Sequence, residues 1–213
     1  MSVQLRRHIG REEFDYPALT AALTGYANVS EKVTSLLRKG VIIRVKKGLY
    51  VFGEDYRFRP YSREVLANLI YGPSFLSLDY ALSFHGLIPE RVEQLTSVTT
   101  GRAREFKTPV GTFVYRPAAK GPFHLGMSRV EQGEVSFLIA CTERALADKV
   151  REDRSARVRS QADAESYLFE DLRVDKSAFR ELDLGFLRQL ADALGSRKVA
   201  FCADLLRRIR GRK

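Results

Sequence analysis

Between Asn28 and Phe52 the chain reads NVSEKVTSLLRKGVIIRVKKGLYVF, where a helical hydrophobic period gives way to the pattern of two β-strands. Asn28 and Glu31 have the spacing of a capping box, in which each side chain accepts from the other residue's backbone N–H. Apolar residues then recur at i, i+4, i+7 and i+8, as one face of a helix requires. They are Val29, Val33, Leu36 and Leu37. The pattern predicts an amphipathic helix that ends at Gly40.

A β-hairpin is predicted directly after this helix. Two runs of β-forming residues, 41–46 and 49–52, flank Lys47-Gly48, a dipeptide typical of a tight turn. A two-residue loop fixes the register of the strands and turns four apolar side chains toward the core. The pairs expected from it are Val45 with Tyr50 and Ile43 with Phe52.

A shorter helix is predicted upstream, over Tyr16–Leu23, with Asp15 or Tyr16 at its N-cap and Gly25 in the turn that follows. Helix, tight turn, helix and basic hairpin in this order are typical of a winged helix-turn-helix. We therefore expect residues 1–60 to form a winged helix-turn-helix DNA-binding domain. The alternative interpretation is a small α+β domain whose polar helix face is merely solvated.

The polar face of the second helix and the basic hairpin are the expected contact surface for double-stranded DNA. Polar side chains on a helix in the major groove read base edges or bind phosphates, and basic side chains of a hairpin bind phosphates. The candidate DNA-binding residues are Lys32, Thr34, Ser35 and Arg38 of the helix and Arg44, Lys46 and Lys47 of the hairpin.

The charge of the chain favours the same class of function. Its 213 residues include 36 Lys and Arg against 26 Asp and Glu, a net charge of +10, with the excess at the two ends. A basic domain most often has a polyanionic partner, usually nucleic acid. No apolar run has the length of a membrane span or a signal peptide, so we expect a cytoplasmic protein without a membrane partner.

Downstream of a polar segment at 53–60, helical and strand patterns alternate. Helices are predicted over 62–70, 78–85, 184–194 and 199–209, with Ser77 as the N-cap of the second, and strands over 95–99, 104–108, 111–115 and 135–139. We therefore expect an α+β protein, with a larger mixed α/β C-terminal domain over residues 61–213 that is helical from 151 onward. Few apolar residues are expected to cross the linker, so that each unit buries its surface alone.

Several blocks of sequence carry a family resemblance. They are Leu36–Gly40 with Arg44–Val51, Ser77–Glu90, Thr96–Thr99 with Arg104–Phe113, and Ile139–Asp148. On these blocks the chain resembles the AbiEi-type antitoxins of type IV toxin–antitoxin systems, over roughly residues 14–150. The first block is common to many winged helices, whereas the later blocks are longer and more specific. After Asp148 the chain departs from the family's aliphatic run, with Lys149-Val150-Arg151-Glu152 in its place.

The resemblance implies a DNA-binding transcriptional regulator that represses its own promoter. It also implies that the C-terminal domain is an antitoxin, which counters a nucleotidyltransferase toxin encoded by a neighbouring gene without direct contact being assumed. A first alternative is a winged-helix transcription factor with a ligand-sensing C-terminal domain and no toxin partner.

A second alternative is a metal-dependent nuclease. Glu105 and Lys107 have the Glu-x-Lys spacing of such enzymes, with Asp79 upstream, but Asp79 falls at the start of a predicted helix rather than on a neighbouring strand. The two cysteines and three histidines lack metal-ligand spacing. We therefore expect no catalytic residue, metal or cofactor, and interpret Arg102, Arg104 and Lys107 as a candidate second basic patch.

Overall fold

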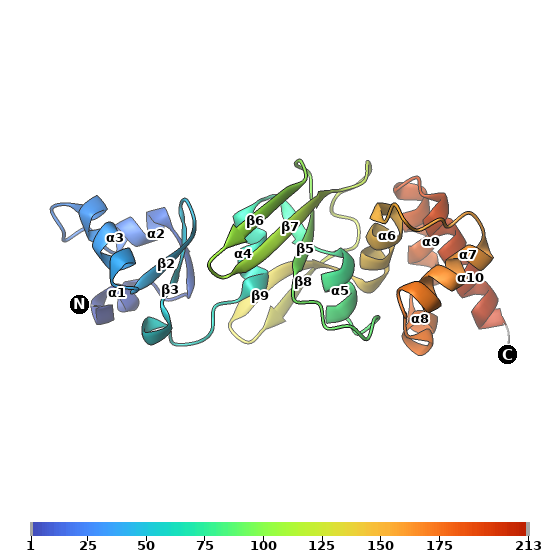
Figure 1. Ribbon diagram of the computed structural model, residues 1–213, viewed down its shortest axis with the longest axis horizontal. Coiled ribbons are helices and arrows are strands. Elements are labelled where there is room, and N and C mark those ends of the chain that lie inside the picture. Colours follow the sequence, from blue (N-terminus) through green and yellow to red (C-terminus); the bar gives the residue numbers. More distant parts are fainter. Residues whose placement is uncertain (1, 212–213) are drawn as a thin grey trace.

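The computed structural model describes residues 2–211 and has an α+β architecture. Met1, Arg212 and Lys213, which fall within the two units expected from the sequence, lie outside the described residues. Figure 1 shows a three-stranded sheet with helices near the N-terminus, a six-stranded sheet in the middle and a group of helices at the C-terminus. Within residues 2–211, no helix combines the length and apolar character needed to cross a membrane.

The N-terminal unit contains the two helices and the hairpin predicted from its caps and hydrophobic periods, together with a further helix over residues 2–8 and a short strand over residues 13–15 that were not predicted. Its helices are α1 (Ser2–His8), α2 (Tyr16–Ala21) and α3 (Val29–Arg38), and its strands are β1 (Glu13–Asp15), β2 (Ile42–Lys46) and β3 (Leu49–Phe52), in the antiparallel order β1-β3-β2. The carboxylate of Asp15 accepts from the backbone N–H of Ala18 at 2.9 Å, and Asn28 accepts from that of Glu31 at 3.1 Å. Gly40 follows α3 at a φ of +67°, where a residue with a Cβ is strained.

The hairpin turn lies at Lys47-Gly48 as predicted, but the predicted register is wrong by one residue. Lys46 is opposite Leu49, whereas Arg44 is opposite Tyr50, so the register shifts between Arg44 and Lys46. A β-bulge adds one unpaired residue to a strand and displaces all the pairs beyond it. Val45 is the extra residue here, and its side chain is buried.

Apolar side chains cover both faces of this small sheet. Tyr50 and Phe52 belong to a buried cluster with the helices α1–α3. Val45, Leu49 and Val51 instead belong to the large buried cluster that contains α4 and the central sheet. The expectation that few apolar residues cross between the two parts of the chain is therefore wrong.

The segment expected to be a linker is also tied to the N-terminal unit. It contains a short 3₁₀ helix, η1 (Glu54–Tyr56). The buried carboxylate of Glu12 accepts from the backbone N–H groups of Phe58 at 2.9 Å and Arg59 at 3.2 Å, and it forms an ion pair with Arg6. These bonds fix the path of the chain between the two sheets.

The central unit is built on a six-stranded mixed sheet in the order β6-β7-β5-β4-β9-β8. Its elements are α4 (Arg63–Ile70), β4 (Ser74–Leu76), α5 (Leu78–Phe84), β5 (Leu95–Thr99), β6 (Arg104–Thr108), β7 (Gly111–Pro117), β8 (Met127–Gln132), β9 (Val135–Ala140) and α6 (Thr142–Glu152). All four predicted strands are present, and β4 and β8 were missed. The sequence signal of β4 is weak because it has three residues, and β8 is an edge strand without a clear apolar alternation.

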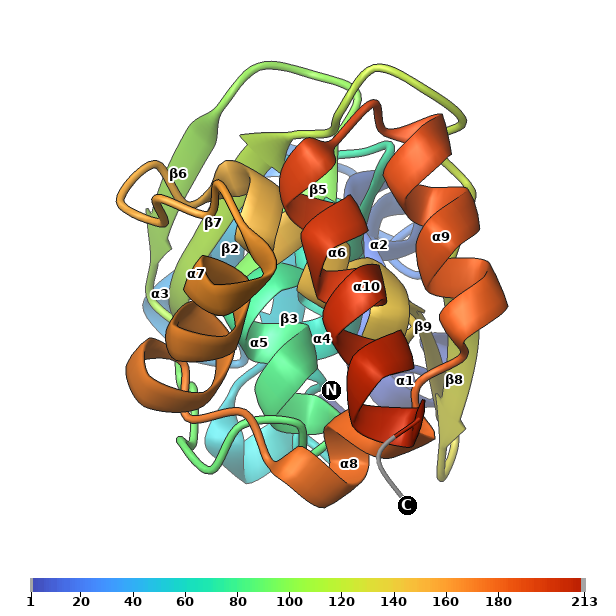
Figure 2. The ribbon, with the colours of Figure 1, turned by 90° about the vertical axis from the view of Figure 1, so that its right-hand side faces the viewer.

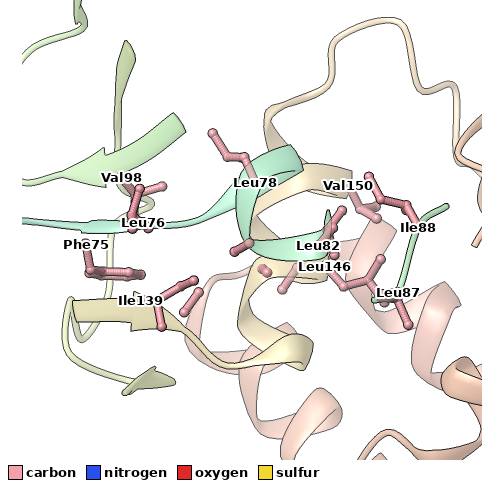
Figure 3. Packing of buried hydrophobic residues seen from close by; sticks show 14 of the residues in the cluster. Phe75, Leu76, Leu78, Leu82, Leu87, Ile88, Val98, Ile139, Leu146 and Val150 are labelled. Atoms are coloured by element: carbon pink, nitrogen blue, oxygen red, sulfur yellow. The ribbon is translucent and has the colours of Figure 1, made fainter. Parts of the chain in front are cut away.

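Helices pack on both faces of the central sheet. On one face, the hydroxyl of Tyr115 in β7 donates to the carbonyl oxygen of Ala67 in α4 at 2.6 Å. On the other, the guanidinium of Arg144 in α6 lies 5.3 Å from the ring centroid of Phe75 in β4. Figure 3 shows the apolar side chains that join the strands to α5 and α6, among them Phe75 and Leu146.

The C-terminal part is helical, as its amphipathic pattern predicted. It comprises α7 (Gln161–Ser166), a π-helical turn η2 (Tyr167–Asp171), α8 (Lys176–Glu181), α9 (Leu184–Ala193) and α10 (Arg197–Gly211). Figure 2 shows α9 and α10 side by side, with α6 behind them, and both helices contact α6. The C-terminal helices therefore extend the central core rather than forming a separate one.

A buried polar network lies at the junction of β4, α5 and α6. The carboxylate of Asp148 accepts from the guanidinium of Arg144 at 3.0 Å and from the hydroxyl of Ser77 at 2.8 Å, and Arg144 also donates to the carbonyl oxygen of Leu125. Arg144 and Asp148 are both fully buried. Ser77 was expected to cap α5 with its hydroxyl, but that hydroxyl is bound to Asp148 and makes no capping bond.

Removal of one member of this network should strongly destabilise the fold, because it leaves an uncompensated buried charge. We expect Asp148→Ala to lower the free energy of unfolding by about 3–5 kcal/mol. Glu131→Ala is the matched control, since Glu131 pairs with Arg129 on the exposed face of β8, and it should cost at most about 1 kcal/mol. Urea denaturation of the full chain measures both values, and equal costs would contradict the role given to the network.

Candidate nucleic-acid interface

The helix α3 presents a polar face to solvent because its apolar face is packed. Val33 and Leu36 are buried in the cluster of the N-terminal unit. Thr34 and Arg38, one turn apart, are exposed, and Ser35 beside them is half-buried. Arg38 forms no ion pair with any residue in the described part of the chain. Its guanidinium is therefore available to an external anion.

Two of the helix residues also have local roles. The hydroxyl of Thr34 donates to the backbone carbonyl of Ser30 at 3.1 Å, which leaves the oxygen of this exposed side chain able to accept a hydrogen bond. The ammonium of Lys32 lies 4.2 Å from the ring centroid of Tyr26, in the turn between α2 and α3. A cation over an aromatic face is stabilised by the ring quadrupole, which holds Lys32 near that turn.

Arg44 lies on the same side of the small sheet as α3. Its guanidinium is 5.9 Å from the ring centroid of Tyr50, and that ring is 6.5 Å from the ring of Tyr16 at the start of α2. Arg44 is exposed and has no ion pair within residues 2–211. The exposed rings of Tyr16 and Tyr26 therefore flank the basic residues, which the sequence analysis did not anticipate. The sequence holds no clear signal for them, because no Lys or Arg lies between Tyr16 and Tyr26.

The two lysines at the hairpin turn have different surroundings. The ammonium of Lys46 donates to the backbone carbonyl of Ile70, at the end of α4 in the central unit. Lys47 is exposed at the tip, and the carbonyl of the next residue, Gly48, accepts from the backbone N–H of Tyr16 at 2.9 Å. Lys47 is thus placed beside α2, while Lys46 points toward the other unit.

The candidate second patch is not brought onto one surface. Arg104 and Lys107 are an odd number of residues apart on β6, so they point to opposite faces of the sheet. Lys107 lies 3.7 Å from the carboxylate of Glu105. Arg102 is exposed in the loop before β6, where its backbone N–H donates to the hydroxyl of Tyr71 at 3.2 Å.

The residues considered for catalysis or metal binding do not form an active site in the described part of the chain. Asp79 forms an ion pair of 2.7 Å with Lys149. Burial raises the pKa of Cys141 to about 11 and that of Cys202 to about 12, so both thiols are protonated at neutral pH and weakly nucleophilic. Among the residues that the structure describes, no group of three or more His, Cys, Asp or Glu side chains has an arrangement that suits a metal ion.

Comparison with known proteins assigns neither a family nor a function to the chain. No protein-family model matches the chain, and no curated protein matches it significantly.

The different surroundings of the two hairpin lysines give a test of this interface. We expect Lys46→Ala to lower the free energy of unfolding by about 1 kcal/mol, since it removes one hydrogen bond to α4. Lys47→Ala should leave stability unchanged but reduce the salt slope of DNA binding by about 1, the effect of losing one phosphate contact. Thermal unfolding and fluorescence anisotropy at several salt concentrations measure the two effects. A reduced salt slope with unchanged stability in Lys46→Ala would contradict the placement of Lys46.

Proposed function

We propose that residues 1–60 form a winged helix-turn-helix and that the chain is a DNA-binding transcriptional regulator. The observation that carries the proposal is the helix α3, with Val33 and Leu36 buried and Thr34 and Arg38 exposed on the opposite side. Helix α2, the turn and the hairpin β2–β3 surround α3 in the order typical of winged helices. A helix of ten residues is about 15 Å long and fits into the major groove.

The proposed division of contacts follows from exposure. Thr34 and Arg38, which are exposed along α3, and the half-buried Ser35 beside them are the candidates for base edges. Lys32, Arg44 and Lys47 lie at the borders of this surface and are the candidates for phosphate contacts, which fix position rather than sequence. Lys46 belongs to the contact with α4 and is left out of the interface.

The antitoxin role is proposed from the family resemblance. Two of the blocks that carry it, Ser77–Glu90 and Ile139–Asp148, are joined by the buried hydrogen bond between Ser77 and Asp148. The block that begins at Thr96 contacts the same place, because the hydroxyl of Thr96 donates to the carbonyl of Ser77 at 2.7 Å. These blocks thus lie together in one structural core of this chain. We propose that the protein represses its own promoter and counters a nucleotidyltransferase toxin.

DNA binding should depend on salt and on the outward face of α3. If α3 and the hairpin neutralise about five phosphates, log K should fall with log salt at a slope of roughly −4 to −5. Arg38→Ala should cost about 1–3 kcal/mol on the native promoter and less on random DNA, if the guanidinium reads a guanine. Gel shift and anisotropy with the upstream DNA measure both.

Arg129→Ala is the matched control, because it removes an exposed arginine from β8 in the central unit. It should leave promoter binding unchanged. Absence of promoter binding by the folded wild-type chain, or an equal loss in both variants, would overturn the assignment of α3.

The two proposed activities should separate in the full chain. Arg38→Ala combined with Arg44→Ala should abolish promoter repression in a reporter assay, since both exposed guanidinium groups are lost. The same variant should still rescue cells that express the nucleotidyltransferase encoded next to the gene, because the central unit is unchanged. Failure of the wild-type chain to rescue would leave a regulator without an antitoxin role.

A further inference from the structure

A polar groove lies on the central sheet, away from the proposed DNA-binding face. It has a volume of about 540 Å³ and is bordered by Thr96 of β5, Val114 of β7, Asp79 of α5 and Lys149 of α6. Arg116, near the end of β7, and Arg154, just after α6, also border it. Ligand sites for small molecules commonly measure about 300–1,000 Å³, so this groove is large enough for a molecule of nucleotide size.

The carboxylates of this groove are already satisfied by the protein. Asp79 pairs with Lys149 at 2.7 Å. Burial alone would raise the pKa of Asp153, but hydrogen bonds from Ser155 and Tyr167, together with the charge of Lys149, lower it below its usual range. The carboxylate of Glu152 lies 3.8 Å from the guanidinium of Arg151. The negative charges therefore have cationic or hydrogen-bond partners.

The two arginines of the groove have no such partners among the described residues. Arg116 and Arg154 are exposed, and neither forms an ion pair or a side-chain hydrogen bond with any residue in the range 2–211. The groove thus carries two exposed guanidinium groups, from different segments of the chain, that are not engaged by the described residues. A guanidinium presents a planar fork of N–H groups that matches the oxygen atoms of a phosphate.

The floor of the groove is held in place by the surrounding hydrogen bonds. The backbone N–H of Ser77 donates to the carbonyl of Thr96 at 3.0 Å, and the hydroxyl of Thr96 accepts from the backbone N–H of Tyr80 at 3.2 Å. Leu78, between them, has a φ of +59°, a strained conformation for a residue with a large side chain. The hydrogen bonds of Ser77 and Thr96 stabilise this strained turn, so the part of the groove floor formed by Leu78 and Thr96 is fixed by bonds within the protein.

We propose that the groove binds a small phosphate-bearing molecule, with Arg116 and Arg154 holding the phosphate. The apolar surface of Val114 and Leu78 and the polar groups of Gln94 and Thr96 then face the rest of the ligand. This site does not rest on the proposed DNA binding, because none of its residues lies in α2, α3 or the hairpin.

The experiment is isothermal titration of the full chain with inorganic phosphate, pyrophosphate and AMP. We expect saturable binding of at least one of these probes at one site per chain. Arg116→Gln and Arg154→Gln should each weaken it about tenfold or more. Both variants should keep the unfolding temperature of the wild type, since neither arginine has a partner in the described residues.

Arg104→Gln is the matched control, because it removes an arginine from the opposite face of the same sheet. It should change the affinity by less than about twofold. No saturable binding of any probe up to about 10 mM would overturn the proposal. Equal weakening in Arg104→Gln would do so too, since it would indicate attraction by net charge alone. Promoter affinity is measured in parallel and should be unchanged in Arg116→Gln, so that failure of one site is distinguished from failure of the other.

Discussion

The buried ion pair between Arg144 and Asp148 is the constraint on which the arrangement of the central unit depends. Two opposite charges in an apolar interior are tolerated only when their hydrogen bonds are completed by neighbours. The neighbours that bond here are Ser77, directly after β4, and the carbonyl of Leu125, before β8, while the second carboxylate oxygen of Asp148 has no hydrogen-bond partner among the described residues. The pair therefore fixes α6 against two loops that are far apart in the sequence.

The position of α6 in turn decides the positions of α9 and α10, which pack on it. Helices α9 and α10 contact α6, and Lys149, one residue after Asp148, reaches the carboxylate of Asp79 at 2.7 Å. Burial raises the pKa of Asp148, while Arg144 and Ser77 oppose this effect. Both partners therefore limit the rise of this pKa as long as their geometry is kept. The groove beside α6 and the C-terminal helices share this one anchor.

The sequence predicted those features that depend on local interactions. The caps at Asp15 and Asn28, the buried side of α3 and the turn at Lys47-Gly48 follow from side chains a few residues apart. Features that depend on distant partners were not predicted. At the bulge, the side chain of Val45 packs into the large cluster that contains α4. The sequence of the hairpin alone does not reveal that this second face of the sheet is covered.

The candidate site shows the same division. The outward face of α3 was predicted, because it is the complement of an apolar stripe. The bond from Lys46 to Ile70 and that from Ser77 to Asp148 each join residues at least 24 positions apart, which no spacing rule connects. Likewise, the lack of ion-pair partners for Arg116 and Arg154 among the described residues becomes visible only when the neighbours of every charge are known.

The two covered faces of the small sheet have a consequence for synthesis of the chain. Tyr50 and Phe52 pack on helices that precede them, whereas Val45, Leu49 and Val51 pack in the cluster that includes Leu66 and Ile70 of α4. A nascent chain folds from its N-terminus as it leaves the ribosome. The N-terminal unit therefore emerges with one apolar sheet face uncovered, and that face stays open to water, or to a chaperone, until α4 has followed it out of the exit tunnel.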